Sequence, residues 1–266
     1  MSGGARLPPA SRRYAELTSS SVAALPADTV VVQPVGAIEQ HGPHLPLATD
    51  ALIAESVAAA AVAQASAPCW QLPTLAYGKS NEHLGFPGTI SLSTETMLAM
   101  CRDVGRSLAR AGIGKLAFVN GHGGQPGLLE TAARDIRAET GLQVFTVTPM
   151  RLGPPPGLAI ADAAFGIHGG ELETSLMLAL APELVHMESA APDGRAAERL
   201  FAGCRYLTLE GLVPTAWLTR DLSATGVLGD PRGATRAAGQ AIFDHWVSAV
   251  AGALTEITRF DFPPTP

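Results

Sequence analysis

The sequence predicts an α/β fold in which a mostly parallel sheet is covered by helices on both faces. Short apolar runs rich in β-branched residues alternate with helical patterns, which is the order of repeated βα units. The run at residues 115–120 has the composition of a strand that is buried on both sides. Since parallel strands need crossover helices between them, both observations indicate the same architecture.

Each predicted element follows from a local signal. Strands are predicted at residues 29–35, 70–75, 115–120 and 142–148, with a late strand at 205–212. Helices are predicted from residue 50 onward, from a cap at Thr94 to residue 111, and over residues 126–140, 171–181 and 230–258, the last with Pro231 in its first turn. The Pro/Gly-rich residues 153–157 are predicted to form a loop or lid.

Length and charge narrow the class of protein. With 266 residues, 47% of them hydrophobic, the chain can bury a large core, and we expect one domain over residues 1–266 with a frayed tail at residues 1–15. The net charge of −6 comes without an acidic or basic block, so we expect neither nucleic acid nor an anionic membrane as a partner. A small molecule or a peptide is the expected partner.

The cysteines and the longest apolar run indicate the cellular compartment of the protein. Cys69, Cys101 and Cys204 are odd in number and widely spaced, which predicts reduced thiols and a cytoplasmic protein. Cys101 has no histidine near it in the sequence, so thiol catalysis is not expected. The apolar residues 57–67 fall well short of the roughly 20 that a bilayer requires, and they predict a buried helix.

Three potential metal ligands follow the first predicted strand. Glu39 and His41 lie in a loop after that strand, and Asp50 stands where the next helix begins. Ligands of open α/β sheets bind beyond the carboxyl ends of the strands, and carboxylate and imidazole donors suit zinc, manganese or iron. The alternative is that Asp50 only caps the helix and that Glu39 and His41 are solvated loop residues.

The third predicted strand ends in a glycine-rich loop with the sequence NGHGG at residues 120–124. Gly123 and Gly124 allow the backbone to approach a ligand closely, and His122 stands free at the strand end. The alternative is a phosphate-cradling turn of a nucleotide-binding protein, but the spacing matches neither the Rossmann nor the Walker fingerprint.

A late segment, IHGGELETS at residues 167–175, places His168 and two acids at the start of a helix. A helix separates Glu171 and Glu173 by about 200°, so only one of them can readily face a site. We expect Glu173 to do so, and Glu171 to complement the helix dipole.

Together these segments resemble the creatininase family of metal-dependent amidohydrolases. Its pattern is Glu-x-His, an Asp 11 residues after that Glu, an NGHGG-like loop and a late HxGxxETS, and all four occur here in order. The resemblance covers residues 33–230 and includes YGKSNEH at 77–83, FPGT at 86–89 and TGVLGDP at 225–231. It implies a three-layer α/β/α sandwich that assembles into a homo-oligomer, usually a hexamer.

The resemblance also implies two divalent metal ions per chain, with zinc the first choice and manganese or iron as alternatives. Glu39 and His122 would hold one ion, His41 the other, and Asp50 would bridge the two. A hydroxide shared by the ions would attack an amide carbonyl, and His168 or Glu173 would pass a proton to the departing nitrogen.

Two departures from the family pattern matter. Creatininase proper has a Glu two residues after the loop histidine, where this chain has Gly124, so Glu173 is the expected replacement ligand and Gln125 a weaker one. Creatininase also has a Trp-Asp pair before the late histidine, where this chain has Ala164 and Phe165, which argues against creatinine as the substrate. The chain looks more like the subgroup that includes the mycofactocin-precursor peptidase.

The predicted activity is hydrolysis of a carbon–nitrogen bond other than a peptide bond, in a cyclic or small amide. Ser80, His83, Gly123 and Gly124 are the expected substrate contacts. The alternatives are a peptidase that matures a peptide-derived cofactor and a non-hydrolytic protein that binds a small molecule or nucleotide.

Overall fold

A four-stranded parallel sheet forms the centre of the computed structural model, which describes residues 12–209 and 211–263. The strand order is β2-β1-β3-β4. Their bounds are Val30–Val35 for β1, Cys69–Gln71 for β2, Lys115–Asn120 for β3 and Gln143–Val147 for β4. The predicted parallel α/β architecture is confirmed.

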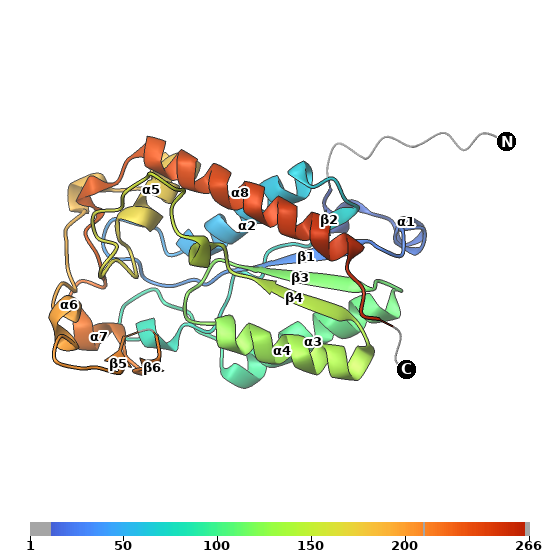
Figure 1. Ribbon diagram of the computed structural model, residues 1–266, viewed down its shortest axis with the longest axis horizontal. Coiled ribbons are helices and arrows are strands. Elements are labelled where there is room, and N and C mark those ends of the chain that lie inside the picture. Colours follow the sequence, from blue (N-terminus) through green and yellow to red (C-terminus); the bar gives the residue numbers. More distant parts are fainter. Residues whose placement is uncertain (1–11, 210, 264–266) are drawn as a thin grey trace.

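Helices cover both faces of the sheet, as Figure 1 shows. On one face lie α2 (Thr49–Gln64), α5 (Glu171–Leu180) and α8 (Arg236–Arg259), and on the other lie α3 (Thr94–Arg110) and α4 (Pro126–Thr140). Alternate strand residues enter two separate cores: Val30 and Val32 pack with α2 and α8, whereas Val31 and Val35 pack with α3 and α4. The three-layer sandwich explains why β1 and β3 are buried over their whole length, since each strand face meets a helix layer.

Two helix starts differ from the sequence prediction. The cap of α3 is Ser93, whose hydroxyl accepts a hydrogen bond from Thr96 N at 3.2 Å, so Thr94 is the first helical residue and not the cap. The last helix starts later than residue 230, because Thr235 has an extended backbone and caps α8. Pro231 instead opens a separate 3-10 turn (Pro231–Gly233).

Two strand predictions were too long. Instead of residues 70–75, β2 covers Cys69–Gln71, because Pro73 has no N–H to continue the ladder. Of residues 205–212, only Leu207–Thr208 forms a strand, β5, which pairs with β6 (Val213–Pro214) outside the central sheet; residue 210 lies outside the described part. These strands belong to a small lobe with α6 (Ala197–Leu200) and α7 (Thr219–Leu222), visible at the left of Figure 1.

The start of the described chain is attached to the sheet edge. The predicted frayed tail covers residues 1–15, of which 1–11 lie outside the described residues. Arg12 donates to the carbonyls of Val62, Ala65 and Ala67, and its own carbonyl accepts from Gln71 N. A 3-10 turn (Tyr14–Glu16) follows, so residues 12–15 are ordered and not frayed.

Within the described residues, no helix is both long and apolar enough to cross a bilayer, and Cys69, Cys101 and Cys204 are free. The loop predicted at residues 153–157 is fixed at its start, where Trp246 Nε1 donates to Gly153 O at 2.7 Å.

Candidate metal centre

The loops that follow two neighbouring strands carry most of the predicted ligands. Val35 at the end of β1 pairs with Asn120 at the end of β3, so both loops leave the sheet side by side. Gly36 and Gly121 begin these loops, and a Cβ on either would overlap the backbone at the first turn of α2. Because neither has a side chain, α2 can begin directly above the strand ends, and this brings Asp50 to the centre of the site.

Asp50 lies between two groups of potential metal ligands. The groups are Glu39, Asp50 and His122, and His41, Asp50 and Glu173, with ligand atoms within 4.8 Å of one another in each group. Asp50 Oδ2 lies 3.1 Å from His122 Nδ1, and Asp50 Oδ1 lies 3.1 Å from His41 Nε2. One carboxylate therefore turns one oxygen to each group, and Glu173 stands in the second group, as expected from the absence of a Glu at position 124.

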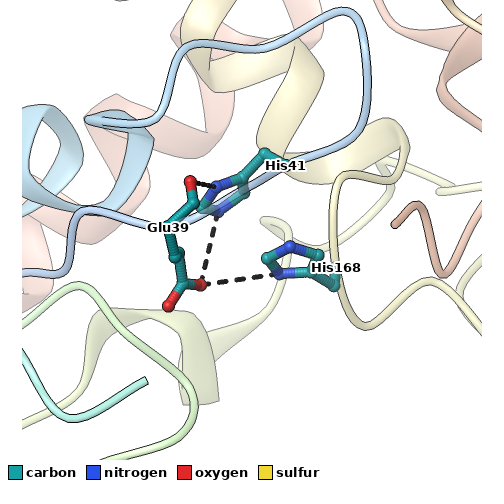
Figure 2. Close-up of side chains that lie close together, drawn as sticks. All are labelled: Glu39, His41 and His168. Atoms are coloured by element: carbon teal, nitrogen blue, oxygen red, sulfur yellow. Dashed lines mark hydrogen bonds and ion pairs between the residues drawn. The ribbon is translucent and has the colours of Figure 1, made fainter. Parts of the chain in front are cut away.

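A third group joins His168 to the same centre. Glu39 Oε1 lies 3.8 Å from His41 Nε2 and 3.7 Å from His168 Nδ1. Figure 2 shows one oxygen of the Glu39 carboxylate facing a nitrogen of each imidazole, and the two ring centroids are 4.2 Å apart. The structure thus brings together all the predicted metal ligands and His168.

Each of the three imidazoles has one ring nitrogen against a backbone carbonyl. The pairs are His41 Nδ1 with Glu39 O at 3.2 Å, His122 Nε2 with Lys79 O at 3.0 Å, and His168 Nε2 with Gln40 O at 2.6 Å. A carbonyl oxygen only accepts, so the nitrogen that faces it carries the proton. When such a ring is neutral, its opposite nitrogen presents a lone pair to the carboxylates, as in a metal-ligating histidine.

One buried oxygen tests whether a cation fits this centre. Asp50 is 1% exposed, and among the described residues its Oδ2 has no hydrogen-bond partner, although His122 Nδ1 is 3.1 Å away. The two atoms are close, but they do not form an aligned hydrogen bond. A buried carboxylate oxygen without a donor is costly, and a divalent cation would satisfy both atoms at once.

The carboxylates also draw protons to these imidazoles. Burial acts to lower the pKa of His41, but Asp50 outweighs it and raises the pKa to about 10. Burial opposes protonation of His122 too, yet Glu39 and Asp50 hold its pKa well above the ordinary value. The centre therefore attracts positive charge strongly, and a metal ion must displace these protons to bind.

Glu173 has the opposite perturbation. Burial raises its pKa to about 7, and the negative charges of Asp50 and Glu39 act in the same direction. Its Oε2 accepts a hydrogen bond from Gly169 N at 2.6 Å, and its Oε1 lies 4.0 Å from His41 Nε2. Near neutral pH Glu173 is poised between its two forms, and a cation beside it would favour the carboxylate.

A cavity opens beside the centre, and three of the four predicted substrate contacts line it: His83, Gly123 and Gly124. His83 stacks on His168 with ring centroids 4.0 Å apart. Ser80 is placed differently, because it is fully buried and its hydroxyl donates to Glu39 Oε2. The structure thus puts Ser80 behind a candidate ligand.

The remaining acid and amide of the motifs, Glu171 and Gln125, lie outside the three ligand groups. Glu171 Oε2 accepts a hydrogen bond from Ala161 N at 2.7 Å, so this side chain holds a loop. Gln125 Nε2 donates to Asn120 Oδ1 at 3.0 Å. Neither joins a ligand group among the described residues.

Sequence reasoning missed several residues at the site. The cavity is also lined by Glu82, Met150, Ile167 and Trp217. Trp217 comes from the small lobe, where no site residue was predicted. Gln40 is also part of the arrangement: its Nε2 lies 3.0 Å from His83 Nδ1. The only sequence evidence for a role of Gln40 was its position between Glu39 and His41. Sequence spacing does not give the direction of a side chain.

The fold and the site define a parallel α/β protein with a buried candidate centre for divalent metal ions, built around one shared carboxylate. Residues 15–254 match the family described as "Creatininase: Creatinine amidohydrolase", and the chain belongs to this family of hydrolases.

Relatives in this family carry two kinds of name. The chain is 37% identical over 253 residues to a "Mycofactocin precursor peptide peptidase" of Mycobacterium ulcerans (strain Agy99), covering 89% of this chain and 90% of that protein. It is 31% identical over 259 residues to a "Creatinine amidohydrolase" of Pseudomonas putida, covering 90% and 92%.

Solved structures agree with the fold. A structure described as "Creatininase Mn" superposes with a TM-score of 0.75 at 27% identity, covering 92% of this chain and 98% of that one. A mutant creatininase of the "Zn-Zn type" gives a TM-score of 0.74 with the same identity and coverage. The expected three-layer creatininase fold is confirmed, and these neighbours are manganese or zinc proteins.

Proposed function

We propose that this protein hydrolyses a carbon–nitrogen amide bond with two divalent metal ions. Glu39, Asp50 and His122 would hold one ion, and His41, Asp50 and Glu173 the other. The observation that carries the proposal is the position of Asp50, whose two oxygens each lie 3.1 Å from an imidazole nitrogen of a different group. Zinc is the first choice, because imidazole and carboxylate ligands suit it; manganese and iron accept the same donors.

Divalent ions at such a centre lower the pKa of a water molecule towards neutrality and polarise an amide carbonyl. His168 can handle the proton: its Nε2–H is held by the Gln40 carbonyl, so its Nδ1 faces the centre with a free lone pair. Burial and the nearby imidazoles keep the pKa of His168 well below its ordinary value, so this nitrogen is unprotonated at neutral pH. It can accept a proton from water and deliver it to the leaving nitrogen. If Glu173 is a ligand, this role falls to His168.

The substrate class has two candidates. The first is a small or cyclic amide, with a bond other than a peptide bond, because the cavity is small and its metal side is polar. The second is a short peptide, which is favoured by the apolar wall of Met150, Ile167 and Trp217 and by the higher identity to relatives named peptidases. His83, Gly123 and Gly124 would contact either substrate.

Metal analysis tests the proposal. The purified protein is expected to contain about two divalent ions per chain by elemental analysis, and His41→Ala and Asp50→Ala are each expected to lose most of that metal. Asp103→Asn, on the exposed face of α3, is the control for removing an acid elsewhere. A wild-type protein that is active with almost no metal would refute the proposal, and a protein with neither metal nor hydrolysis would indicate the binding-protein alternative.

A substrate screen separates the two candidate classes. Cyclic amides, imides and short peptides are incubated with the metal-loaded enzyme, and products are detected by mass spectrometry as a gain of one water. Asp50→Ala serves as the blank. Turnover confined to peptides would exclude the small-amide candidate.

We also propose that the chain forms a homo-oligomer, with a hexamer expected from the family resemblance. Large exposed apolar side chains on and beside the small lobe support this, among them Leu84, Leu200, Tyr206, Leu212 and Leu218. Light scattering after gel filtration tests it, and a monomer at micromolar concentration would contradict it.

A further inference from the structure

Glu82 lies on the far side of His122 from the candidate metal centre. It belongs to a 3-10 turn (Asn81–His83), and its side chain is 15% exposed at the cavity wall. Its Oε1 lies 3.3 Å from His122 Nε2, whereas the candidate ligands Glu39 and Asp50 lie 3.2 Å and 3.1 Å from Nδ1 of the same ring. The imidazole is thus held between a carboxylate on one edge and the candidate ligands on the other.

The glycine at position 124 leaves room for this carboxylate. A Cβ at Gly124 would overlap Glu82 Oε1 and would lie 2.6 Å from His122 Nε2. Glu82 therefore occupies the volume beside His122 that a side chain at position 124 would otherwise enter.

We propose that Glu82 is a positioning residue that holds His122 for metal binding, and that it can do so only because residue 124 is glycine. The proposal rests on the proposed metal function of His122. Lys79 O, at 3.0 Å, is the nearer acceptor for the Nε2 proton and fixes the tautomer, while Glu82 adds a negative charge beside the same proton. A carboxylate in this position makes the opposite nitrogen a better ligand and fixes the orientation of the ring.

The first test is the metal affinity of Glu82→Gln, which keeps the size of the side chain but removes its charge. Its zinc dissociation constant, measured by competition with a chromogenic chelator, is expected to rise about 10- to 100-fold, the usual cost of losing such a partner. The visible absorption spectrum of the cobalt-loaded variant is expected to change as well, since the ligand field at His122 changes. A merely structural role would leave both unaltered in folded protein.

The second test exploits the glycine. Gly124→Ala is expected to weaken zinc binding at least as much as Glu82→Gln, because the new Cβ collides with both Glu82 and His122. Combining Glu82→Ala with Gly124→Ala is expected to cost less than the sum of the two single effects, since both act through one contact. Gly127→Ala is the matched control, because no atom lies within 4 Å of its added Cβ, and its zinc affinity is expected to equal that of wild type.

The outcomes separate this inference from the proposed function. If wild type binds no divalent ion, the proposed function fails. If wild type binds two ions and folded Glu82→Gln matches it in zinc affinity and cobalt spectrum, the inference about Glu82 alone is overturned. Circular dichroism establishes folding; should Glu82→Gln not fold, wild-type zinc affinity in folded Gly124→Ala would overturn the inference equally.

Discussion

The two ends of the central strands both bury charge, but they satisfy it differently. At the amino end of β3, Lys115 is 4% exposed, and its ammonium donates to the carbonyls of Ile257, Thr258 and Phe260 at 3.0, 2.7 and 2.7 Å. Three donors meet three acceptors at the C-terminus of α8, where the helix dipole also favours a cation. At this end, the protein's own carbonyl groups therefore satisfy the buried charge.

At the carboxyl end of β1 and β3, the protein does not supply every buried carboxylate oxygen with a hydrogen-bond donor. Glu39, Asp50 and Glu173 are all less than a tenth exposed, their charged partners are imidazoles, and Asp50 Oδ2 has no aligned donor among the described residues. A buried charge that the protein satisfies by itself contributes to stability, whereas one that it leaves incomplete marks a place for a ligand. The difference between the two ends identifies the functional one.

Metal removal should give the largest effect. If the incomplete end binds ions, chelator treatment is expected to lower the melting temperature by roughly 8–16 °C, which corresponds to about 4 kcal/mol for a ligand at 1,000 times its Kd. Differential scanning calorimetry measures this, with Asp50→Asn as the control in which the chelator should change nothing. Equal melting temperatures with and without metal in wild type would contradict the contrast.

Lys115→Met should destabilise the protein without changing its metal binding. Three buried carbonyls lose their donors, and we expect a loss of about 3 kcal/mol and a melting temperature lower by roughly 6–12 °C, with metal stoichiometry unchanged. Chemical denaturation measures the loss of stability, and elemental analysis measures the metal stoichiometry. Arg134→Met, at an exposed position of α4, is the control for removing a cation. A loss of metal in folded Lys115→Met would mean that the two ends are not independent.

The pH dependence of the metal-free protein should show a smaller effect. The pKa of Glu173 is raised to about 7, so its stabilising contribution is complete below the unfolded value and is lost as the pH rises through 7. The pKa of His41, raised to about 10, gives a loss of the same sign at higher pH. The pKa of His168 is held below its ordinary value and contributes with the opposite sign in this range, so the effect of Glu173 is measured as a difference between two proteins. The melting temperature of chelator-treated wild type relative to that of Glu173→Gln is expected to fall from about pH 5 to about pH 8. A rise of this difference over that range would show the sign to be wrong.

The smallest expected effect concerns the hydroxyl of Ser80, which donates a hydrogen bond to Glu39. Ser80→Ala removes the hydrogen bond to Glu39 Oε2 but leaves the carboxylate in place, so zinc affinity is expected to fall only about tenfold, or about 1.4 kcal/mol. Ser107→Ala, which lies on the surface of α3, is its control. A loss of metal as complete as that of Asp50→Ala would show that Ser80 does more than support Glu39.

Much of this contrast was visible in the sequence. The order of the βα units, the ends of β3 and α4, and the placement of Glu39, His41, Asp50 and His122 after strands all follow from hydrophobic period and turn residues, which are local properties. The departure at Gly124 also indicated that Glu173 would complete the second group, and the structure places it there.

Tertiary structure decided what spacing along the chain cannot encode. Only the fold brings Glu82 into the volume beside Gly124 and fixes His122 and His168 by carbonyls from distant segments. It also places the Ser80 hydroxyl against Glu39 and the Lys115 ammonium against a helix end 142 residues away. These are contacts between distant segments, and their geometry depends on how helices pack on the sheet. The sequence alone determined which residues could bind a metal, and packing decided which atoms of those residues face it.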